Sequence, residues 1–454
     1  MEPITAWSNI QLEHLFYAYR KAKADCFFER VSNVADEFIE YEKNLPSNLN
    51  KLLQRLQNGE IEILLKENLG RPRVIAKKLS TKPHDSQDKN TGHIFFSDPE
   101  RAFDSLVQTS DLIPEFRLIG HFPTEMHILS ALWVNLIGHK FDGALSSSAY
   151  GSRLRRYRPV HGSPKGSLGE YHLEAIGSFH PYFEPYKKWR ENGFKAIRKE
   201  LEDDQEGEQS VIAISFDIKS YYHNIDPSFA ANPEFHKWAN IKNLTEWDRL
   251  FTLAFVEALK LWAKKVREAI DAIDSNLDTP VLGGIPIGLS FTHVIANVLL
   301  VGLDREIKEG LTPIFYGRYV DDMFLVLRDP KTISNVNELI GFIRARIKSF
   351  ETNPDAKDEI VLKFPNSESF IGDSKLILQQ SKQKTFFLHG QAGLDLLDNI
   401  QTQIRSVSSE RRQMPSVDRL EEMASAKILT AAGQASEEAD TLRRADGLAV
   451  RRLS

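Results

Sequence analysis

The tetrapeptide Tyr319-Val320-Asp321-Asp322 constrains the fold of this 454-residue chain more than any other feature. It lies between two short apolar runs, residues 314–316 and 323–327. Two apolar runs joined by so short a polar link predict a β-hairpin with a tight turn. Adjacent carboxylates repel each other, and a fold tolerates them best where a cation neutralises them. The turn therefore indicates a Mg²⁺ site serving phosphate chemistry, with an ordinary solvated Asp turn as the alternative.

A third carboxylate, Asp217, lies upstream. The residues before it, 211–216, form an apolar, β-prone run that predicts a buried strand. An acid at the end of a core strand is costly to bury unless something pairs with it. Two divalent ions shared with Asp321 and Asp322 would be such partners, because two metals together activate an attacking oxygen and stabilise a leaving pyrophosphate. The alternative is that Asp217 only caps the next turn.

A glycine-rich loop lies between these two elements. Residues 283–290 read Gly-Gly-Ile-Pro-Ile-Gly-Leu-Ser, and a helical run with Asn297 inside it follows over 291–303. The glycines allow close approach of another backbone, and Pro286 stiffens the turn. A loop of this kind at the start of a helix suits a base pair or a phosphate, although on its own it is usually only a turn.

The order and spacing of these three elements resemble the palm of reverse transcriptases, over roughly residues 205–330. The resemblance implies that Asp217, Asp321 and Asp322 are the catalytic residues. It also implies that they hold two Mg²⁺ ions, with help from the backbone carbonyl of Ile218.

The resemblance further implies a nucleotide site. The backbone N–H groups of Ser220 and Tyr221 would lie near the triphosphate, and Tyr222 would clash with a ribose 2′-OH and so select dNTPs. Ile287 and Gly288 would complete the nucleotide contacts. Many reverse transcriptases have Gln where this chain has Ile287. The Gly-Ile-Pro-Ile-Gly version looks like the prokaryotic defence-associated and abortive-infection reverse transcriptases, a group that includes unusual templating and priming.

Four arginines follow one another closely in residues 144–158, a segment that looks like the fingers of that group. On a strand, Arg153 and Arg155 would share one face while Arg156 and Arg158 share the other. We expect Arg153 and Arg155 to bind the nucleotide. We expect Arg156 and Arg158 to bind the nucleic-acid backbone, since the guanidinium fork matches phosphate oxygens.

Charge distribution is more informative than net charge, which at -5 does not indicate a nucleic-acid binder. Residues 151–200 carry 11 Lys or Arg against 5 Asp or Glu, with aromatic residues interleaved. Basic side chains neutralise phosphates while aromatic rings stack on bases. We therefore expect Lys187 and Lys188 to contact nucleic acid, with a solvated surface over a small aromatic core as the alternative.

The single cysteine, Cys26, excludes an intramolecular disulfide framework and fits a reducing cytoplasm. A long apolar run and a signal-peptide pattern are both absent from the sequence, which speaks against a membrane role.

Apolar spacing predicts an α+β chain, with helices over residues 1–70, 124–139 and 247–273. The resemblance implies a right-hand polymerase. An N-terminal helical region and fingers would span 1–204, and a palm of antiparallel sheet plus helices 205–390. A helical thumb or C-terminal extension would span 391–454. Residues 385–390 look like a primer-grip strand. Apolar helical faces near the C-terminus predict a partner protein or a homo-oligomer.

The function that the resemblance implies is RNA-directed DNA polymerisation in bacterial antiviral defence. The expected partners are an RNA template, with a non-coding RNA as one candidate, a DNA product and dNTPs. One alternative is template-independent or protein-primed DNA synthesis by the same palm. An alternative of another class is a non-catalytic RNA-binding scaffold.

Overall fold

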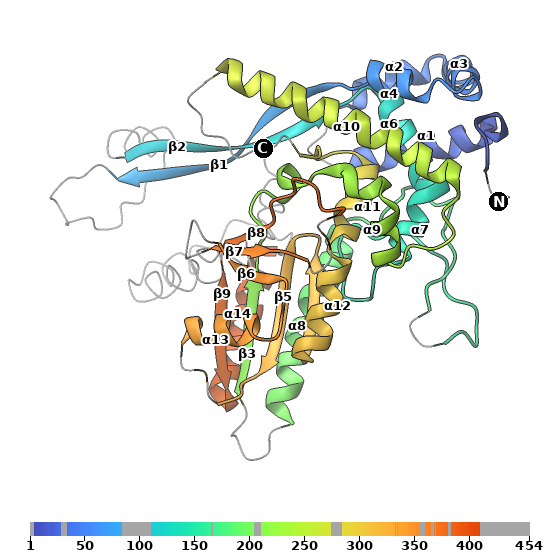
Figure 1. Ribbon diagram of the computed structural model, residues 1–454. Helices are drawn as coiled ribbons and strands as arrows, with labels where there is room; N and C mark the ends of the chain where they lie inside the picture. Colours follow the sequence, from blue (N-terminus) through green and yellow to red (C-terminus); the bar gives the residue numbers. More distant parts are fainter. Residues whose placement is uncertain are drawn as a thin grey trace.

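Helices and antiparallel strands are both extensive, so the chain has the predicted α+β class (Figure 1). The computed structural model describes residues 4–28, 34–83, 110–164, 167–203, 210–273, 284–331, 333, 335–353, 359–364, 367, 369–379 and 383–408.

Most helices gather in one lobe, here called the helical lobe (Figure 1). Its helices follow the apolar spacing of the sequence; in α3, for example, Leu49, Leu52 and Leu56 are buried. The predicted helix over 124–139 is present, but a π-helix at Val134–Gly138 interrupts it. The helices of the lobe are α1 (Leu12–Phe28), α2 (Ala35–Glu42), α3 (Leu45–Gln57), α4 (Ile61–Glu67), α6 (Thr124–Trp133), α7 (His139–Asp142), α9 (Pro233–Trp238) and α10 (Glu246–Ile273).

A two-stranded ribbon extends from the helical lobe (Figure 1). It consists of β1 (Arg71–Pro83) paired antiparallel with β2 (Ser110–His121). The base of the ribbon is fixed, because the N–H of Gly120 donates to the carbonyl of Ile287 at 3.2 Å. The ribbon is therefore joined at its base to the glycine-rich loop.

The central sheet has four antiparallel strands in the order β4-β5-β3-β9. The predicted hairpin is confirmed, since β4 (Phe315–Tyr319) and β5 (Asp322–Arg328) are joined by the two residues between them. The predicted strand before Asp217 is β3 (Ser210–Phe216). The strand expected over 385–390 is β9 (Lys384–His389).

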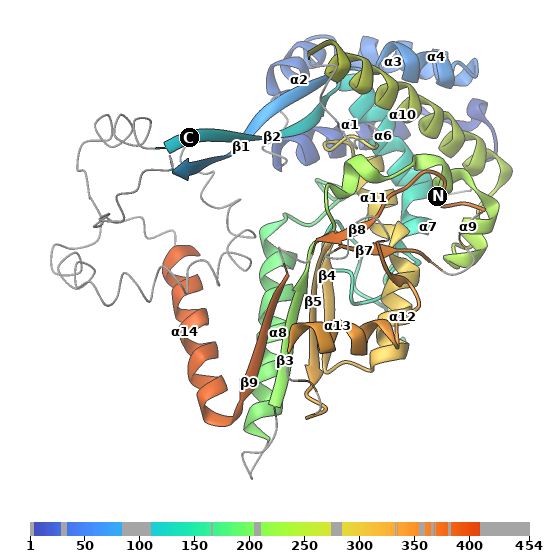
Figure 2. The ribbon, with the colours of Figure 1, turned by 60° about the vertical axis from the view of Figure 1, so that its left-hand side comes forward.

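Each face of this sheet is covered by helices (Figure 2). Alternate residues of β3 point to opposite faces. Ile212, Ile214 and Phe216 belong to the large core, together with side chains of α11 (Ser290–Leu299), α12 (Val301–Leu311) and α13 (Val336–Arg344). Val211 and Ala213 belong to a second apolar cluster with α8 (Phe183–Glu202) and α14 (Gly390–Ser408).

A smaller sheet adjoins the end of β3. It contains β6 (Phe350–Thr352), β7 (Glu359–Leu362) and β8 (Ile377–Gln379) in that order. Ile218 forms an isolated antiparallel bridge with Leu378, and the N–H of Lys219 donates to the carbonyl of Ile377 at 2.8 Å. These bonds fix the chain immediately after Asp217.

Two helices almost wholly outside the predicted palm region 205–390 pack on the central sheet. Helix α8 lies within the predicted region 1–204, and α14 lies within 391–454 except for Gly390; both helices pack on the central sheet. The C-terminal helical pattern beyond residue 408 lies outside the described residues. Among the helices that are described, none combines the length and the apolar character needed to cross a bilayer.

Two glycines give a test of this packing. A Cβ on Gly193 of α8 would lie 2.1 Å from the ring of Phe324, whereas one on Gly341 of α13 would meet nothing within 4 Å. We expect Gly193→Ala to lower the free energy of unfolding by about 1–3 kcal/mol, because the ring must be displaced. We expect Gly341→Ala to raise it by up to about 1 kcal/mol, because Ala favours a helix. Urea unfolding measures both, and equal effects would contradict the close approach of α8 to β5.

Candidate functional site

Two of the three predicted carboxylates lie opposite each other at one end of the central sheet. The last residues paired between β3 and β5 are Phe216 and Met323. One step further in the same register, Asp217 faces Asp322. Residues directly opposite on antiparallel strands have Cβ atoms about 4.5–5.5 Å apart, so these carboxylates are neighbours.

Both carboxylates lie on the sheet face that carries α8 and α14. Asp217 and Asp322 line a small hollow of ≈ 50 Å³, whose other walls are mainly apolar side chains of β3, β5, β9 and the two helices. Among the residues that the structure describes, no three His, Cys, Asp or Glu side chains converge closely enough to hold a metal ion. A complete three-carboxylate site is therefore not preformed there, and the two-ion site stays a prediction.

The third carboxylate belongs to a strained turn. Tyr319 pairs with Asp322, so Val320 and Asp321 form a two-residue hairpin loop. Such loops need a positive φ at the first position, and Val320 has φ 60. For a β-branched residue this conformation costs about 1–3 kcal/mol, so surrounding contacts must hold it. Gly151 makes one of these contacts. It packs so closely on the turn that a Cβ at this position would lie 2.9 Å from the Val320 nitrogen.

A buried arginine holds this turn from the interior. Arg318 has no exposed surface, and all five of its N–H donors are used. Its Nε and Nη2 atoms donate to the two oxygens of Asp304, at 2.7 and 2.9 Å. The remaining donors reach the side-chain oxygen and the carbonyl of Asn297 and the carbonyl of Val320. Tyr316 donates to the same Asp304 carboxylate at 2.7 Å.

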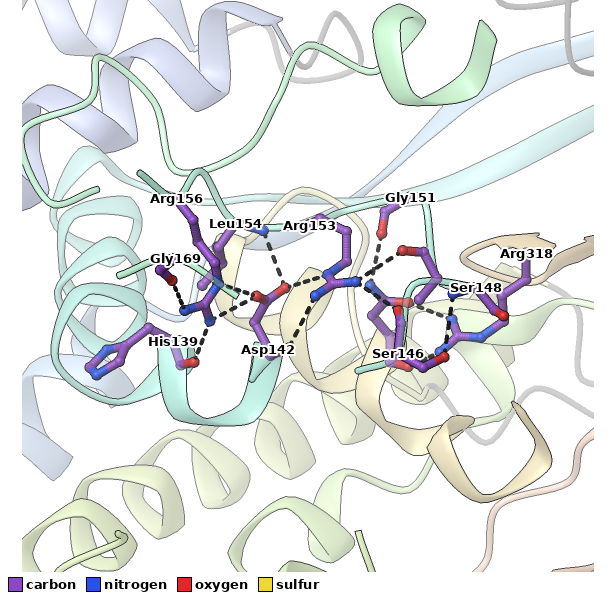
Figure 3. Close-up of polar contacts among 12 residues, drawn as sticks. His139, Asp142, Ser146, Ser148, Gly151, Arg153, Leu154, Arg156, Gly169 and Arg318 are labelled. Atoms are coloured by element: carbon purple, nitrogen blue, oxygen red, sulfur yellow. Dashed lines mark hydrogen bonds and ion pairs between the residues drawn. The ribbon is translucent and has the colours of Figure 1, made fainter. Parts of the chain in front are cut away.

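The backbone of the same arginine joins the hairpin to the segment before α8 (Figure 3). The N–H of Arg318 donates to the carbonyl of Ser148 at 2.8 Å, and its carbonyl accepts from the N–H of Tyr150 at 2.9 Å. Asn297 donates to the carbonyl of Gly151 at 2.8 Å. Helices α11 and α12 and the segment 148–151 are therefore all joined to β4 around Arg318, next to the acidic turn.

The predicted division of the four arginines between two strand faces is wrong. Arg153 and Arg156 both bind the buried carboxylate of Asp142, with Nε atoms 2.9 and 3.0 Å from its two oxygens (Figure 3). Residues 152–158 are not a regular strand: Leu154 and Arg156 each make an isolated bridge, and the chain turns at Ser152, which has φ 48. Their contacts make Arg153 and Arg156 part of the scaffold. Nucleotide binding by Arg153 and nucleic-acid binding by Arg156 stay predictions.

The other predicted basic residues do not bind Asp142: Arg155 bonds a backbone carbonyl, and the remaining three are exposed. The Nε of Arg155 donates to the carbonyl of Phe179 at 2.8 Å. The ring of Phe179 packs against His293, near the predicted nucleotide site. Arg158 is exposed. Lys187 and Lys188 are exposed on α8, and Lys187 pairs with Glu191 at 3.8 Å. These exposed cations have surface available for phosphate.

The predicted sugar-selecting tyrosine is held by a histidine that the sequence did not single out. The hydroxyl of Tyr222 lies 3.1 Å from Nδ1 of His293 on α11. The His293 ring in turn packs at 5.7 Å against Phe179. Tyr222 is half-buried, whereas Tyr221 is buried and donates to the carbonyl of Ala296 at 2.6 Å. Only the backbone of Tyr221 is therefore available to a ligand.

The backbone at the end of β3 turns sharply. Ser220 has φ 49 and begins the short helix Tyr221–Asn224. Within the described residues, the N–H groups of Ser220 and Tyr221 donate no hydrogen bond to another residue. Burial raises the pKa of the Tyr221 hydroxyl well above its usual value, and the nearby carboxylate of Asp321 adds to the effect. The Tyr221 side chain therefore lies within electrostatic range of the acidic turn.

The glycine-rich loop packs directly on this turn. The N–H of Ile285 donates to the carbonyl of Tyr222 at 2.8 Å. A Cβ on Gly284, which has φ +45, would lie 2.4 Å from the same carbonyl oxygen, so only glycine fits. Ile287 and Gly288 are half-buried beside the base of the ribbon, as the bond from Gly120 requires.

The ribbon also brings a cation to the site. Burial lowers the pKa of His223 to about 4, and the positive charge of Arg117 on β2 contributes. His223 is therefore neutral at pH 7, and Arg117 lies within electrostatic range of the turn. Arg117, His293 and Arg318 are the residues that sequence reasoning missed. Arg318 immediately precedes the acidic tetrapeptide, and an arginine inside the predicted hairpin, between Gly317 and Tyr319, was a usable signal.

No known family model and no curated protein matches this sequence.

The arginine at the centre of the site gives a stability test. Asp304→Asn keeps the shape of the side chain but leaves the buried Arg318 charge without its counter-charge. We expect the free energy of unfolding to fall by about 3–5 kcal/mol. The matched control is Glu246→Gln, which removes one partner of the exposed pair with Arg249 and should change little. Denaturant unfolding of both variants measures the difference, and a small effect of Asp304→Asn would contradict the burial of this pair.

Proposed function

We propose that this chain is an RNA-directed DNA polymerase that acts in bacterial antiviral defence. The observation that carries the proposal is the meeting of Asp217 and Asp322 across the β3–β5 ladder, with Asp321 in the adjoining turn. Three acidic groups at one end of a core sheet are unfavourable unless they serve a cation, which is the arrangement that nucleotidyl transfer needs.

The proposed architecture is a right hand. The central sheet with its covering helices would be the palm, and the ribbon with the helical lobe would be the fingers. Helix α14 would begin the thumb. The bond between Gly120 of the ribbon and Ile287 of the loop supports this assignment, because it holds the proposed fingers against the proposed nucleotide site.

Asp217, Asp321 and Asp322, with the carbonyl of Ile218, would hold two Mg²⁺ ions. Carboxylate and carbonyl oxygens are the ligands that Mg²⁺ prefers, so the donor set fits, although the described residues do not form a converged metal cluster. Bound Mg²⁺ supplies activation of an attacking hydroxyl and stabilisation of the leaving pyrophosphate. The chain's own part is to position the carboxylates, and Arg318 does this by holding the carbonyl of Val320 at 3.1 Å.

Other residues would bind the nucleotide. The unpaired N–H groups of Ser220 and Tyr221 are suited to phosphate oxygens. Arg117 would add a positive charge from the ribbon side. Tyr222, fixed by His293, would leave no room for a 2′-hydroxyl and so favour deoxyribonucleotides. Exposed Arg158, Lys187 and Lys188 would neutralise the phosphates of template or product.

The acidic residues provide the main test. We expect Asp217→Asn, Asp321→Asn and Asp322→Asn each to reduce dNTP incorporation by about 10²-fold or more, because each removes a charge that the ions require. Asp373→Asn, at an exposed Asp outside the site, is the matched control and should retain activity. Primer extension on an RNA template, with Mg²⁺ and after its removal by a chelator, is the measurement.

The same assay separates the alternatives. Synthesis that needs no template would favour template-independent addition, and product joined to the protein would favour protein priming. RNA binding without incorporation by the unaltered chain would favour the non-catalytic scaffold. Near wild-type synthesis by any of the three Asp variants would overturn the two-metal proposal.

Sugar selection gives a second test. Tyr222→Val should open space beside the 2′ carbon and raise the use of ribonucleotides relative to deoxyribonucleotides. Tyr222→Phe keeps the ring but loses the contact with His293, so we expect it to preserve most of the discrimination. Competition between rNTP and dNTP in single-nucleotide extension measures the ratio. An unchanged ratio in Tyr222→Val would mean that Tyr222 is only a packing residue.

A further inference from the structure

A lysine shares the sheet face of Asp217. Strand β9 lies beside β3 at the edge of the central sheet (Figure 2), and its first residue, Lys384, stands opposite Ser215 of β3. Ser215 and Asp217 are two residues apart on the same strand, so their side chains point to one face. Ala213 and Phe386, the next pair along this face, belong to the apolar cluster with α8 and α14. Lys384 therefore points to the side of the sheet that carries Asp217.

The strand register also gives the separation between these two charged residues. When the β3–β9 pairing is continued by one step, Asp217 and Lys384 become diagonal neighbours on adjacent strands. Such residues stand about 7–8 Å apart, a gap that long side chains span. Asp322 faces Asp217 from the other side, on β5. The stem of Lys384 is therefore long enough to bring its ammonium group to the acidic pair.

The small hollow beneath the acidic pair brings the three charges together. Asp217, Asp322 and Lys384 are the charged residues among those that line it, and each is half-buried. Its volume of ≈ 50 Å³ is far below the about 300–1,000 Å³ of a small-molecule site, so it suits the head of a side chain and not a nucleotide. Because its other walls are mainly apolar, opposite charges attract each other there more strongly than in water.

Two facing carboxylates need a counter-charge in the folded chain, because like charges directly opposite each other destabilise a sheet. Lys384 is the one basic residue in the lining of the hollow. We propose that the ammonium group of Lys384 is the resident counter-charge of Asp217 and Asp322, and that it withdraws from them when Mg²⁺ binds. The withdrawal rests on the proposed function, whereas the contact between lysine and carboxylates does not.

A lysine in this position regulates the proposed site. Without metal, its charge keeps the two carboxylates facing each other. When metal binds, the ammonium group must leave, and the free energy of breaking its contact weakens the binding. Coupling of this kind is reciprocal, so the metal weakens the lysine contact by the same factor. Lys384 therefore sets the Mg²⁺ concentration above which the site is filled.

Lys384 has a simpler alternative role. Its aliphatic stem can cover the apolar wall of the hollow while its charged head stays in water. Lys384→Met separates the two roles, because Met keeps an apolar stem and loses the charge. A covering role predicts that this substitution is neutral. The proposal predicts a loss of stability that depends on the facing carboxylates.

Thermal unfolding of the full chain in the presence of a metal chelator tests the contact. We expect Lys384→Met to lower the Tm by about 3 °C or more, and by less than half as much when Asp322→Asn has already removed one facing charge. Lys384→Arg keeps the charge and should unfold as the unaltered chain does. The matched control combines Lys260→Met with Glu257→Gln, an exposed pair of α10 at 3.2 Å, and should show little coupling. Additive effects of Lys384→Met and Asp322→Asn would overturn the proposal.

Calorimetric titration with Mg²⁺ at constant ionic strength tests the withdrawal. We expect Lys384→Met to bind Mg²⁺ at least about fivefold more tightly than the unaltered chain, and Mg²⁺ to raise its Tm by more. Equal affinities would overturn the proposal. Coupled stability effects with no Mg²⁺ binding by either protein would overturn both the withdrawal and the two-ion site. Additive stability effects with normal Mg²⁺ binding would overturn the role of Lys384 and leave that site standing.

Discussion

Burying a full positive charge constrains the middle of this molecule. A guanidinium without solvent must find every partner inside the protein, and Arg318 finds them on α11, on α12 and in the hairpin turn itself. Those partners are fixed relative to one another as a result. The strained Val320 is held by the same group, so the cost of its left-handed backbone is offset by a contact that also sets the direction of the acidic turn. A charge in the core thereby determines the geometry of charges at the surface.

A second polar contact joins the helical lobe to α11, the helix that also binds Arg318. Asp25 on α1 is half-buried, and its carboxylate accepts from the N–H of Ser178 at 2.8 Å and from the hydroxyl of Ser290 at 3.2 Å. Ser290 is the first residue of α11, the helix that carries His293 and Asn297. The start of α11 is thus fixed from the helical lobe, and its last turn, at Asn297, is fixed from the hairpin. Helix α11 therefore connects the helical lobe to the central sheet.

Much of the fold was readable from local pattern, and the failures share a cause. The hairpin, β3 and α10 follow from apolar periodicity, which reports how each segment buries its own side chains. The sequence analysis also predicted that Asp217 shares metal ions with the acidic turn, but the register that puts it opposite Asp322 depends on pairing between strands over 100 residues apart. The predicted placement of Arg153 and Arg156 on opposite strand faces was wrong for the same reason. Their partner, Asp142, lies outside the segment whose alternation was used, and a single buried carboxylate can draw together side chains that strand parity would separate.

The bond between Gly120 and Ile287 has a mechanical consequence. Thirteen residues of β1 give a lever about 40 Å long, with this bond near its base. Over that length a rotation of only about 5° at the fulcrum displaces the far end by about 3–4 Å, roughly the thickness of one stacked base. A change of a few tenths of an ångström in the loop is therefore magnified along the ribbon. Conversely, a force on the far end of the ribbon acts on the glycine-rich loop through the same bond.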